Sequence, residues 1–214
     1  MTVHSFSSAA GAAAPLTRAR VSGSLPVWSL SLGCPKNRVD TEHLLGSLGM
    51  PVHSVEHMGR ARLVFINTCG FIEPAVRESI RSILDAVERL GRCKRRPLLA
   101  VAGCMVGRYG VKDLAADLPE VDLWLPTGEL ENWPAMVREA LGLPAAPAAP
   151  GRLLSTGPSY AWLKVGEGCR HKCAFCTIPS IRGPLRSVPA ADLREEARGL
   201  LAGLWQPAAW EKSL

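Results

Sequence analysis

The side chains in this sequence best suited to chemistry are cysteines. Cys169, Cys173 and Cys176, here called the loop cysteines, follow the spacing Cys-x3-Cys-x2-Cys, with Phe175 directly before the last one. Three thiolates on one short loop can hold a single cluster, because soft sulfur ligands select iron–sulfur clusters or zinc over hard cations. A four-iron, four-sulfur cubane held by three cysteines leaves one iron open. We therefore predict a cluster whose open iron can bind a substrate or cofactor.

Zinc is the alternative for this loop. Cys173 and Cys176 could form a Cys-x2-Cys knuckle, but structural zinc needs four protein ligands in a closed tetrahedron. His171 lies between two of the cysteines, where it is poorly placed to become the fourth ligand. We therefore favour the iron–sulfur interpretation and expect His171 to face solvent.

A second set of cysteines recurs at equal intervals. Cys34, Cys69 and Cys104, here called the strand-end cysteines, lie 35 positions apart in both intervals, each beside a glycine and just after an apolar run. In a parallel sheet the loops after the strands gather at one edge, so these thiols can meet there. Buried cysteines are also common in α/β cores as small apolar residues. The position of each cysteine after a strand, rather than inside it, favours shared metal ligation.

The sequence around these cysteines alternates strands with helices, which predicts a parallel sheet with crossover helices. Strands are expected at 27–32, 63–67, 98–102, 121–125 and 160–165. Helices are expected at 39–48, from 74 onwards, at 130–141 and at 190–201. The predicted fold class is therefore α/β, with a Rossmann-like N-terminal parallel sheet.

Composition divides the chain into four parts. Residues 1–26 are rich in Ala and Ser and contain no acidic residue, which is typical of a disordered tail, with an organellar transit peptide as the alternative. Residues 27–142 are expected to form the N-terminal domain, residues 143–158 a Pro/Ala linker and residues 159–214 a second domain. The linker contains the run LPAAPAAPG, whose prolines favour an extended spacer.

Charge and cysteine content indicate which partners and which cellular compartment to expect. The net charge of +6 weakly favours nucleic acid or a ribonucleoprotein as a partner. No apolar run approaches the ~18 residues needed to cross a bilayer, so no membrane is expected. Seven cysteines, an odd number, without a secretory leader indicate a reducing compartment and metal binding rather than disulfides. We therefore expect a cytoplasmic protein.

Three further residues are considered near these motifs. Cys93 lies among basic residues in GRCKRR, and we expect it to be incidental rather than a redox site. Arg182 and Arg186 follow the loop cysteines closely. In one interpretation these two arginines contact the cofactor or the substrate. We favour the other interpretation, in which they face solvent.

The sequence around all six motif cysteines resembles the radical-SAM methylthiotransferases. The similar segments, within residues 27–198, are SLGCPKNRVDTEHLLGSL, VFINTCGFIEPAVRESI, VAGCM and LKVGEGCRHKCAFCTIPSIRGPLRSVP. Residues 34–37 (CPKN) and 178–183 (IPSIRG) resemble the branch of the family that modifies a ribosomal protein. The tRNA-modifying branches differ at both places.

The resemblance implies two 4Fe–4S clusters and S-adenosyl-L-methionine as cofactors. The cluster on the loop cysteines would bind S-adenosylmethionine and split it to a 5′-deoxyadenosyl radical, so the hard chemistry belongs to the cofactor. The cluster on the strand-end cysteines would present the sulfur that is inserted, and a second S-adenosylmethionine would supply the methyl group. The implied substrate is an aspartate of the small-subunit ribosomal protein S-twelve, alone or in the assembled subunit. A flavodoxin or ferredoxin would donate electrons.

Members of this family continue through a partial TIM-type barrel and a small C-terminal β-barrel. After about Gly199 this sequence no longer follows the family pattern, so we expect residues 159–214 to be the truncated start of a radical-SAM barrel. Two other functions stay open: a tRNA adenosine methylthiotransferase, and an iron–sulfur-binding fragment without catalysis. We expect the N-terminal domain to fold, but we do not expect this chain to turn over alone.

Overall fold

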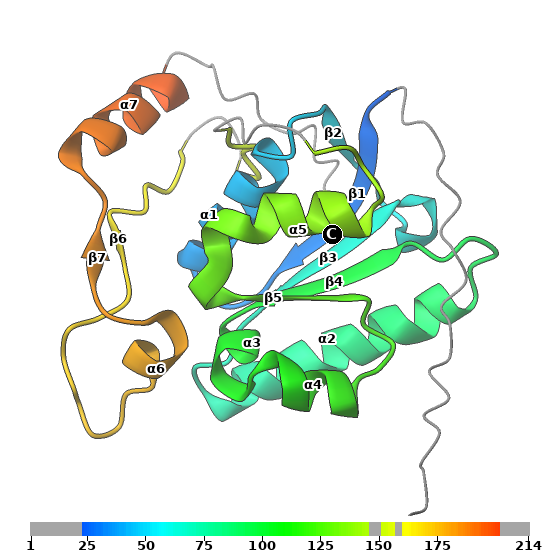
Figure 1. The fold of residues 1–214 in the computed structure, drawn as a ribbon, viewed down its shortest axis with the longest axis horizontal. Helices are drawn as coiled ribbons and strands as arrows, with labels where there is room; N and C mark the ends of the chain where they lie inside the picture. Colours follow the sequence, from blue (N-terminus) through cyan, green and yellow to red (C-terminus); the bar gives the residue numbers. More distant parts are fainter. Residues whose placement is uncertain (1–22, 146–150, 157–159, 202–214) are drawn as a thin grey trace, which may run out of the picture.

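The core of the molecule is a five-stranded parallel sheet, seen in a computed structural model that describes residues 23–145, 151–156 and 160–201 (Figure 1). The strands lie in the order β2-β1-β3-β4-β5, and each neighbouring pair is parallel. Their bounds are Leu25–Ser31 for β1, Val52–Ser54 for β2, Leu63–Thr68 for β3, Leu98–Gly103 for β4 and Leu123–Pro126 for β5. The predicted α/β class with a Rossmann-like sheet is confirmed.

Helices cover both faces of this sheet. They are α1 (Pro35–Gly46), α2 (Glu73–Gly91), α3 (Cys104–Tyr109), α4 (Val111–Asp117) and α5 (Trp133–Ala140), with short 3-10 turns η1 (Met58–Arg60) and η2 (Thr127–Asn132). Helices α1 and α5 lie over one face, and α2, α3 and α4 lie over the other (Figure 1). Every residue of β3 and β4 is buried, which explains the apolar runs at 63–66 and 98–102.

Each face has its own hydrophobic core. On the first face Phe65 of β3 packs edge-on against Trp133 of α5, with ring centroids 6.3 Å apart. On the other face Ile66 of β3 packs with Ile83 and Leu90 of α2. Successive residues of one strand thus enter opposite cores, because side chains alternate across a strand.

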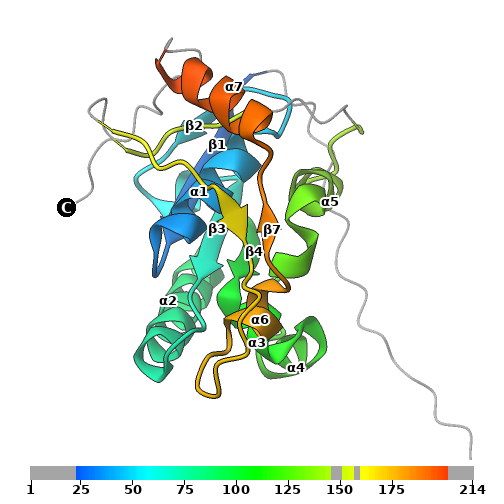
Figure 2. The ribbon, with the colours of Figure 1, turned by 90° about the vertical axis from the view of Figure 1, so that its left-hand side faces the viewer.

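Residues 160–201 lie along the edge of the sheet where the strands end, and α6 packs against α3 (Figure 2). They contain the antiparallel pair β6 (Gly166–Glu167) and β7 (Arg186–Ser187), followed by α7 (Ala190–Leu201). Helix α6 (Ile178–Arg182) belongs to the connection between these two strands. The predicted helix at 190–201 is confirmed. The predicted strand at 160–165 is wrong: among the described residues no strand pairs with it. An apolar run becomes a strand only where a neighbour accepts its backbone hydrogen bonds.

The segment before residue 157 docks on the first domain. Arg152 is 3% exposed, its guanidinium pairs with Glu42 of α1 at 2.7 Å, and Leu153 N donates to the Glu42 backbone oxygen. The predicted linker is therefore held against α1 around Arg152 and Leu153, while its residues 146–150 and 157–158 lie outside the described chain. Residues 1–22 of the predicted tail also lie outside it. Across the described chain, no helix is both long and apolar enough to span a membrane.

Candidate iron–sulfur site

The three strand-end cysteines lie at the carboxyl ends of neighbouring strands. Cys34 follows β1 and caps α1, Cys69 follows β3, and Cys104 opens α3 directly after β4. The chain passes from β1 to β2 on one side and then to β3 on the other, so the sheet reverses its winding between β1 and β3. Open α/β sheets bind ligands at such a switch point. The predicted gathering at one edge is confirmed, and ligation stays a prediction.

Glycines bring the three loops into close approach. Gly33 has φ +81°, and a Cβ there would lie 2.7 Å from Cys69 Cβ and 2.8 Å from its Sγ. Gly70, beside Cys69, would place a Cβ 2.7 Å from the Met105 backbone. The loop after β1 therefore touches the Cys69 side chain, and the loop after β3 touches the residue after Cys104. A larger residue at these glycines would separate the thiols.

Two buried asparagines fix these loops. Asn37 Nδ2 donates to Leu32 O and to Thr68 O, both at 2.9 Å, and so ties the loop after β1 to the end of β3. Asn67 Nδ2 donates to Asn37 O at 2.8 Å. Both asparagines are 0% exposed. The backbone around the thiols is thus held by interior hydrogen bonds, which is the kind of support that a preorganised site needs.

A buried arginine faces this group of thiols. Arg182 Nε donates to Cys104 Sγ at 3.2 Å, and its Nη2 donates to Asn37 Oδ1 at 2.5 Å. Its Nη1 contacts Asp40 Oδ2 at 3.2 Å and Glu167 Oε2 at 2.8 Å. The favoured prediction that Arg182 faces solvent is wrong, because these partners from α1, α3 and β6 enclose it at 5% exposure.

The charges in this group change the pKa values of its members. Burial raises the pKa of the Cys104 thiol, the Arg182 guanidinium opposes that rise, and the nearby Cys69 and Cys34 thiolates add to it. Burial would raise the pKa of Glu167 too, but Arg182 and Lys164 outweigh burial and lower it to about 2. Cys104 is therefore close enough to Cys34 and Cys69 for their charge to affect its pKa, and Glu167 stays ionised.

The loop cysteines occupy the connection between β6 and α6. Cys176 N donates to Cys173 O at 3.1 Å, which closes a turn, and Cys169 N donates to Gly183 O at 3.2 Å. Cys173 is exposed, and the other two are partly buried. Phe175 is 88% exposed, and His171 is exposed as predicted. The loop is thus tied at its base beside Cys169 and open at its tip, where Cys173 lies.

The donor atoms of both cysteine sets suit an iron–sulfur cluster. Within the described residues, no group of three or more His, Cys, Asp or Glu side chains is arranged to hold a metal ion. Each set offers three soft sulfurs and no fourth ligand for a closed zinc site. The residues present therefore fit a cluster with three protein ligands.

Cys93 lies apart from both sets. It follows α2, which runs back from the edge that carries Cys69, and it lies shortly before β4 begins. It is therefore near the opposite edge of the sheet from the strand-end cysteines. Its Sγ contacts Arg89 O at 3.5 Å, and its side chain packs against the core beside α2. This placement agrees with the expectation that Cys93 is incidental.

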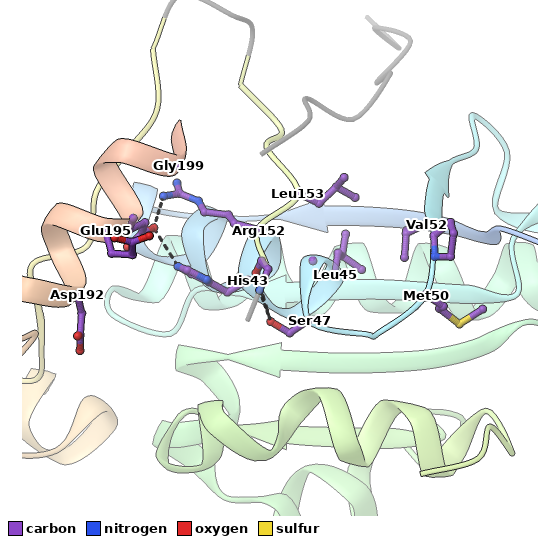
Figure 3. A pocket seen from close by; sticks show the side chains of 14 residues that line it. His43, Leu45, Ser47, Met50, Val52, Arg152, Leu153, Asp192, Glu195 and Gly199 are labelled. Carbon is purple, nitrogen blue, oxygen red and sulfur yellow. Dashed lines mark hydrogen bonds and ion pairs between the residues drawn. The ribbon is translucent and has the colours of Figure 1, made fainter. Parts of the chain in front are cut away.

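A cavity of about 820 Å³ lies between α1, β2, α7 and the segment around Arg152 (Figure 3). Arg152 Nη1 and His43 Nε2 both reach Glu196 Oε1, at 2.7 and 3.3 Å. Burial acts to raise the pKa of Glu196, but hydrogen bonds and charge from His43 and Arg152 lower it overall. No cysteine lines this cavity. Its ion pairs attach α7 to α1, so they serve the fold at a place separate from the thiols.

Known proteins match most of the length of this chain. The family described as "Uncharacterized protein family UPF0004" matches residues 27–126. The protein named "Ribosomal protein uS12 methylthiotransferase RimO" of Nitratidesulfovibrio vulgaris (strain DP4) is 65% identical over 178 residues. The proteins of the same name from Oleidesulfovibrio alaskensis and Geobacter sulfurreducens are 62% and 40% identical over 178 and 191 residues. The chain corresponds to the N-terminal part of RimO-like methylthiotransferases.

The alignments cover most of this chain but less than half of each relative. They cover 83% of this chain in all three cases, but only 41% of the first two relatives and 42% of the third. The chain thus spans about two fifths of the length of the relatives that it matches. Both cysteine sets lie within residues 27–198, where the similar segments were found.

Sequence reasoning missed the charged groups around Arg182 in this RimO-like chain. Asp40 is 3% exposed although it lies on α1, and Lys164 pairs with both Asp40 and Glu167. One signal was available: Asp40 lies four positions from Leu44, on the helix face that carries the apolar residues. The partner of that buried carboxylate could not be read from the sequence. Arg186, by contrast, is exposed as expected.

Proposed function

We propose that this chain is part of a radical-SAM methylthiotransferase that modifies ribosomal protein uS12. The strand-end cysteines hold one 4Fe–4S cluster, and the loop cysteines hold a second, which binds S-adenosyl-L-methionine. The observation that carries the proposal is the convergence of Cys34, Cys69 and Cys104 at the switch point of the sheet. Three thiols at one ligand-binding edge are difficult to explain by core packing alone.

The residues of the chain have separate tasks in this proposal. When bound, the clusters and S-adenosylmethionine supply the one-electron and sulfur chemistry that no side chain can perform. The glycines and asparagines of the N-terminal domain hold the strand-end thiols at one place. The tied base of the loop between β6 and α6 holds the other thiols, while its open tip leaves room for a small-molecule ligand.

The substrate assignment rests on the relatives and on two short motifs. The similar proteins are named for methylthiotransfer to uS12, and residues 34–37 and 178–183 resemble the same branch. We take an aspartate of uS12, free or in the small subunit, as the group modified. A flavodoxin or ferredoxin is the proposed electron donor, and the cytoplasm the proposed location.

The first test counts iron in the chain after anaerobic reconstitution. We expect about eight irons and a similar amount of sulfide per chain, since two 4Fe–4S clusters are proposed. Replacing all three loop cysteines with Ala should remove about half of the iron and leave the spectrum of the other cluster unchanged. Replacing all three strand-end cysteines should remove the other half.

The control and the contrary outcomes are defined by the same measurement. Cys93→Ser should keep all of the iron, because Cys93 lies apart from both sets. Tightly bound zinc in place of iron would overturn the proposal. Loss of all iron from either triple variant would show one shared site instead of two.

The second test concerns the substrate. The chain is joined to the remaining C-terminal part of the Nitratidesulfovibrio vulgaris relative and expressed in cells that lack their own enzyme. Mass spectrometry should then find a methylthio group on uS12 and none on tRNA. A methylthio-adenosine product in tRNA, with unmodified uS12, would contradict the assignment.

A further inference from the structure

Arg182 links the two cysteine sets physically. It is the last residue of α6, which begins two positions after Cys176. Its Nε donates to the sulfur of Cys104, 78 positions earlier in the chain. Helix α6 itself packs against α3, which Cys104 opens. A cationic side chain from the second cysteine region is thus in contact with a ligand proposed for the first cluster.

We propose that Arg182 is a positioning residue that raises the reduction potential of the cluster on the strand-end cysteines. The inference rests on the proposed function, because it takes Cys104 as a cluster ligand. Hydrogen bonds to a ligand sulfur and positive charge beside it stabilise the reduced, more negative state of a cluster. Arg182 supplies both. It stays protonated at every working pH, so this effect does not depend on titration.

The contact with Cys104 is more than a by-product of pairing the nearby carboxylates. Lys164 already pairs with both Asp40 and Glu167, which are the acidic groups in contact with Arg182. The two carboxylates together bind only Nη1 of Arg182. The Nε and Nη2 groups point elsewhere, to Cys104 Sγ and to the Asn37 amide oxygen.

Asn37 sets the orientation of the guanidinium. Its Nδ2 is bound to Leu32 O and Thr68 O, so the amide plane is fixed and its Oδ1 faces Arg182. A guanidinium is planar, so the bond to Asn37 and the bonds to the carboxylates determine where Nε points. That direction is toward the sulfur of Cys104. The side chain of Arg182 is 2% exposed, so water does not weaken the interaction.

Loss of Arg182 would lower the reduction potential of the cluster in two ways. The hydrogen bond to the Cys104 sulfur would disappear. The carboxylates of Asp40 and Glu167 would also lose one of their cationic partners and keep Lys164 and, at Glu167, Lys36, so the site becomes one unit less positive. Both changes disfavour adding an electron, so the reduction potential should fall.

The experiment measures this potential on the strand-end cluster alone. The full chain carrying Cys169→Ala, Cys173→Ala and Cys176→Ala is reconstituted anaerobically and titrated with dithionite, with the reduced cluster followed by electron paramagnetic resonance. At a fixed solution potential, Arg182→Met should lower the ratio of reduced to oxidised cluster about tenfold, equivalent to about −59 mV for one electron. The matched control Arg186→Met removes an exposed charge four positions away and should leave the potential unchanged.

A second variant keeps the inference testable if Arg182→Met fails to bind iron. Arg182→Lys retains the charge but lacks the planar fork, so it should bind iron and show a smaller negative shift. An unchanged potential in either variant at full iron content would overturn the inference. Loss of iron from both variants, with a native circular dichroism spectrum, would also overturn the inference. Arg182 would then be needed to bind the cluster and would have no separate effect on its reduction potential. If the parent triple variant itself bound no iron, the strand-end cysteines would hold no separate cluster, and the proposed function would be refuted before this inference.

Discussion

Replacing Gly103 with alanine should destabilise the protein and disturb the strand-end cysteines. Gly103 is the last residue of β4, directly before Cys104, and has φ +101° and ψ −159°, a region of backbone conformation that is essentially restricted to glycine. A Cβ there would lie 2.3 Å from Asn67 Oδ1 and 2.4 Å from Thr68 O. Thr68 O belongs to the end of β3, so rotating a side chain cannot relieve the clash.

The expected magnitude combines two effects. Backbone strain at such a residue costs about 1–3 kcal/mol. Overpacking of a tight interior adds about 1–3 kcal/mol. The free energy of unfolding should therefore fall by about 2–6 kcal/mol, which for a slope near 2 kcal/mol per M lowers the urea midpoint by about 1–3 M. Tryptophan fluorescence can follow the transition, because Trp124 and Trp133 lie in the two cores.

Gly91 provides the matched control for this substitution. It ends α2 with a negative φ, and a Cβ there would meet no atom within 4 Å. Gly91→Ala should be neutral or stabilise by about 0.5–1 kcal/mol, because alanine has less backbone freedom to lose. Gly103→Ala should also hold less iron at the strand-end cysteines. Equal urea midpoints for the two variants would refute this account of how the loops approach one another.

Two further perturbations test the attachment of residues 151–201 to the first domain. Arg152→Met should lower the free energy of unfolding by about 3–5 kcal/mol, because Glu42 would be left buried without its partner; the exposed Arg77→Met should change it by about 0.3–0.5 kcal/mol. Burial acts to raise the pKa of Glu196, but the neighbouring His43 and Arg152 lower it below its ordinary value in the folded state. The ionised Glu196 carboxylate therefore stabilises the fold above the ordinary pKa of a glutamate, and this stabilisation is lost as the pH falls through the lowered pKa. Glu196→Gln should make the free energy of unfolding, measured by urea titration, fall less steeply as the pH is lowered. The same change at the exposed Glu195 should not.

The central strands were predictable because burial on both faces produces a local run of apolar residues in the sequence. Strands at 63–67 and 98–102 were expected, and β3 and β4 extend each by one residue to Thr68 and Gly103. A strand covered on both faces is apolar at most positions, and the run ends at Asn67 in β3 and at Gly103 in β4. Helix α3 was missed, because Cys104 was placed in a loop; its six residues are too few to show a helical period.

The sequence alone determined four strands of the sheet, the edge at which Cys34, Cys69 and Cys104 meet, and the likeness to methylthiotransferases; β2 was not predicted. These follow from apolar runs, short spacings and contiguous motifs, all of which are local in the chain. Only the tertiary structure decided that Arg182 is buried against Cys104, and that 160–165 is not a strand. Whether a charge is solvated, or a strand paired, depends on groups far away in sequence, and in this molecule the partners of Arg182 include one 145 positions distant.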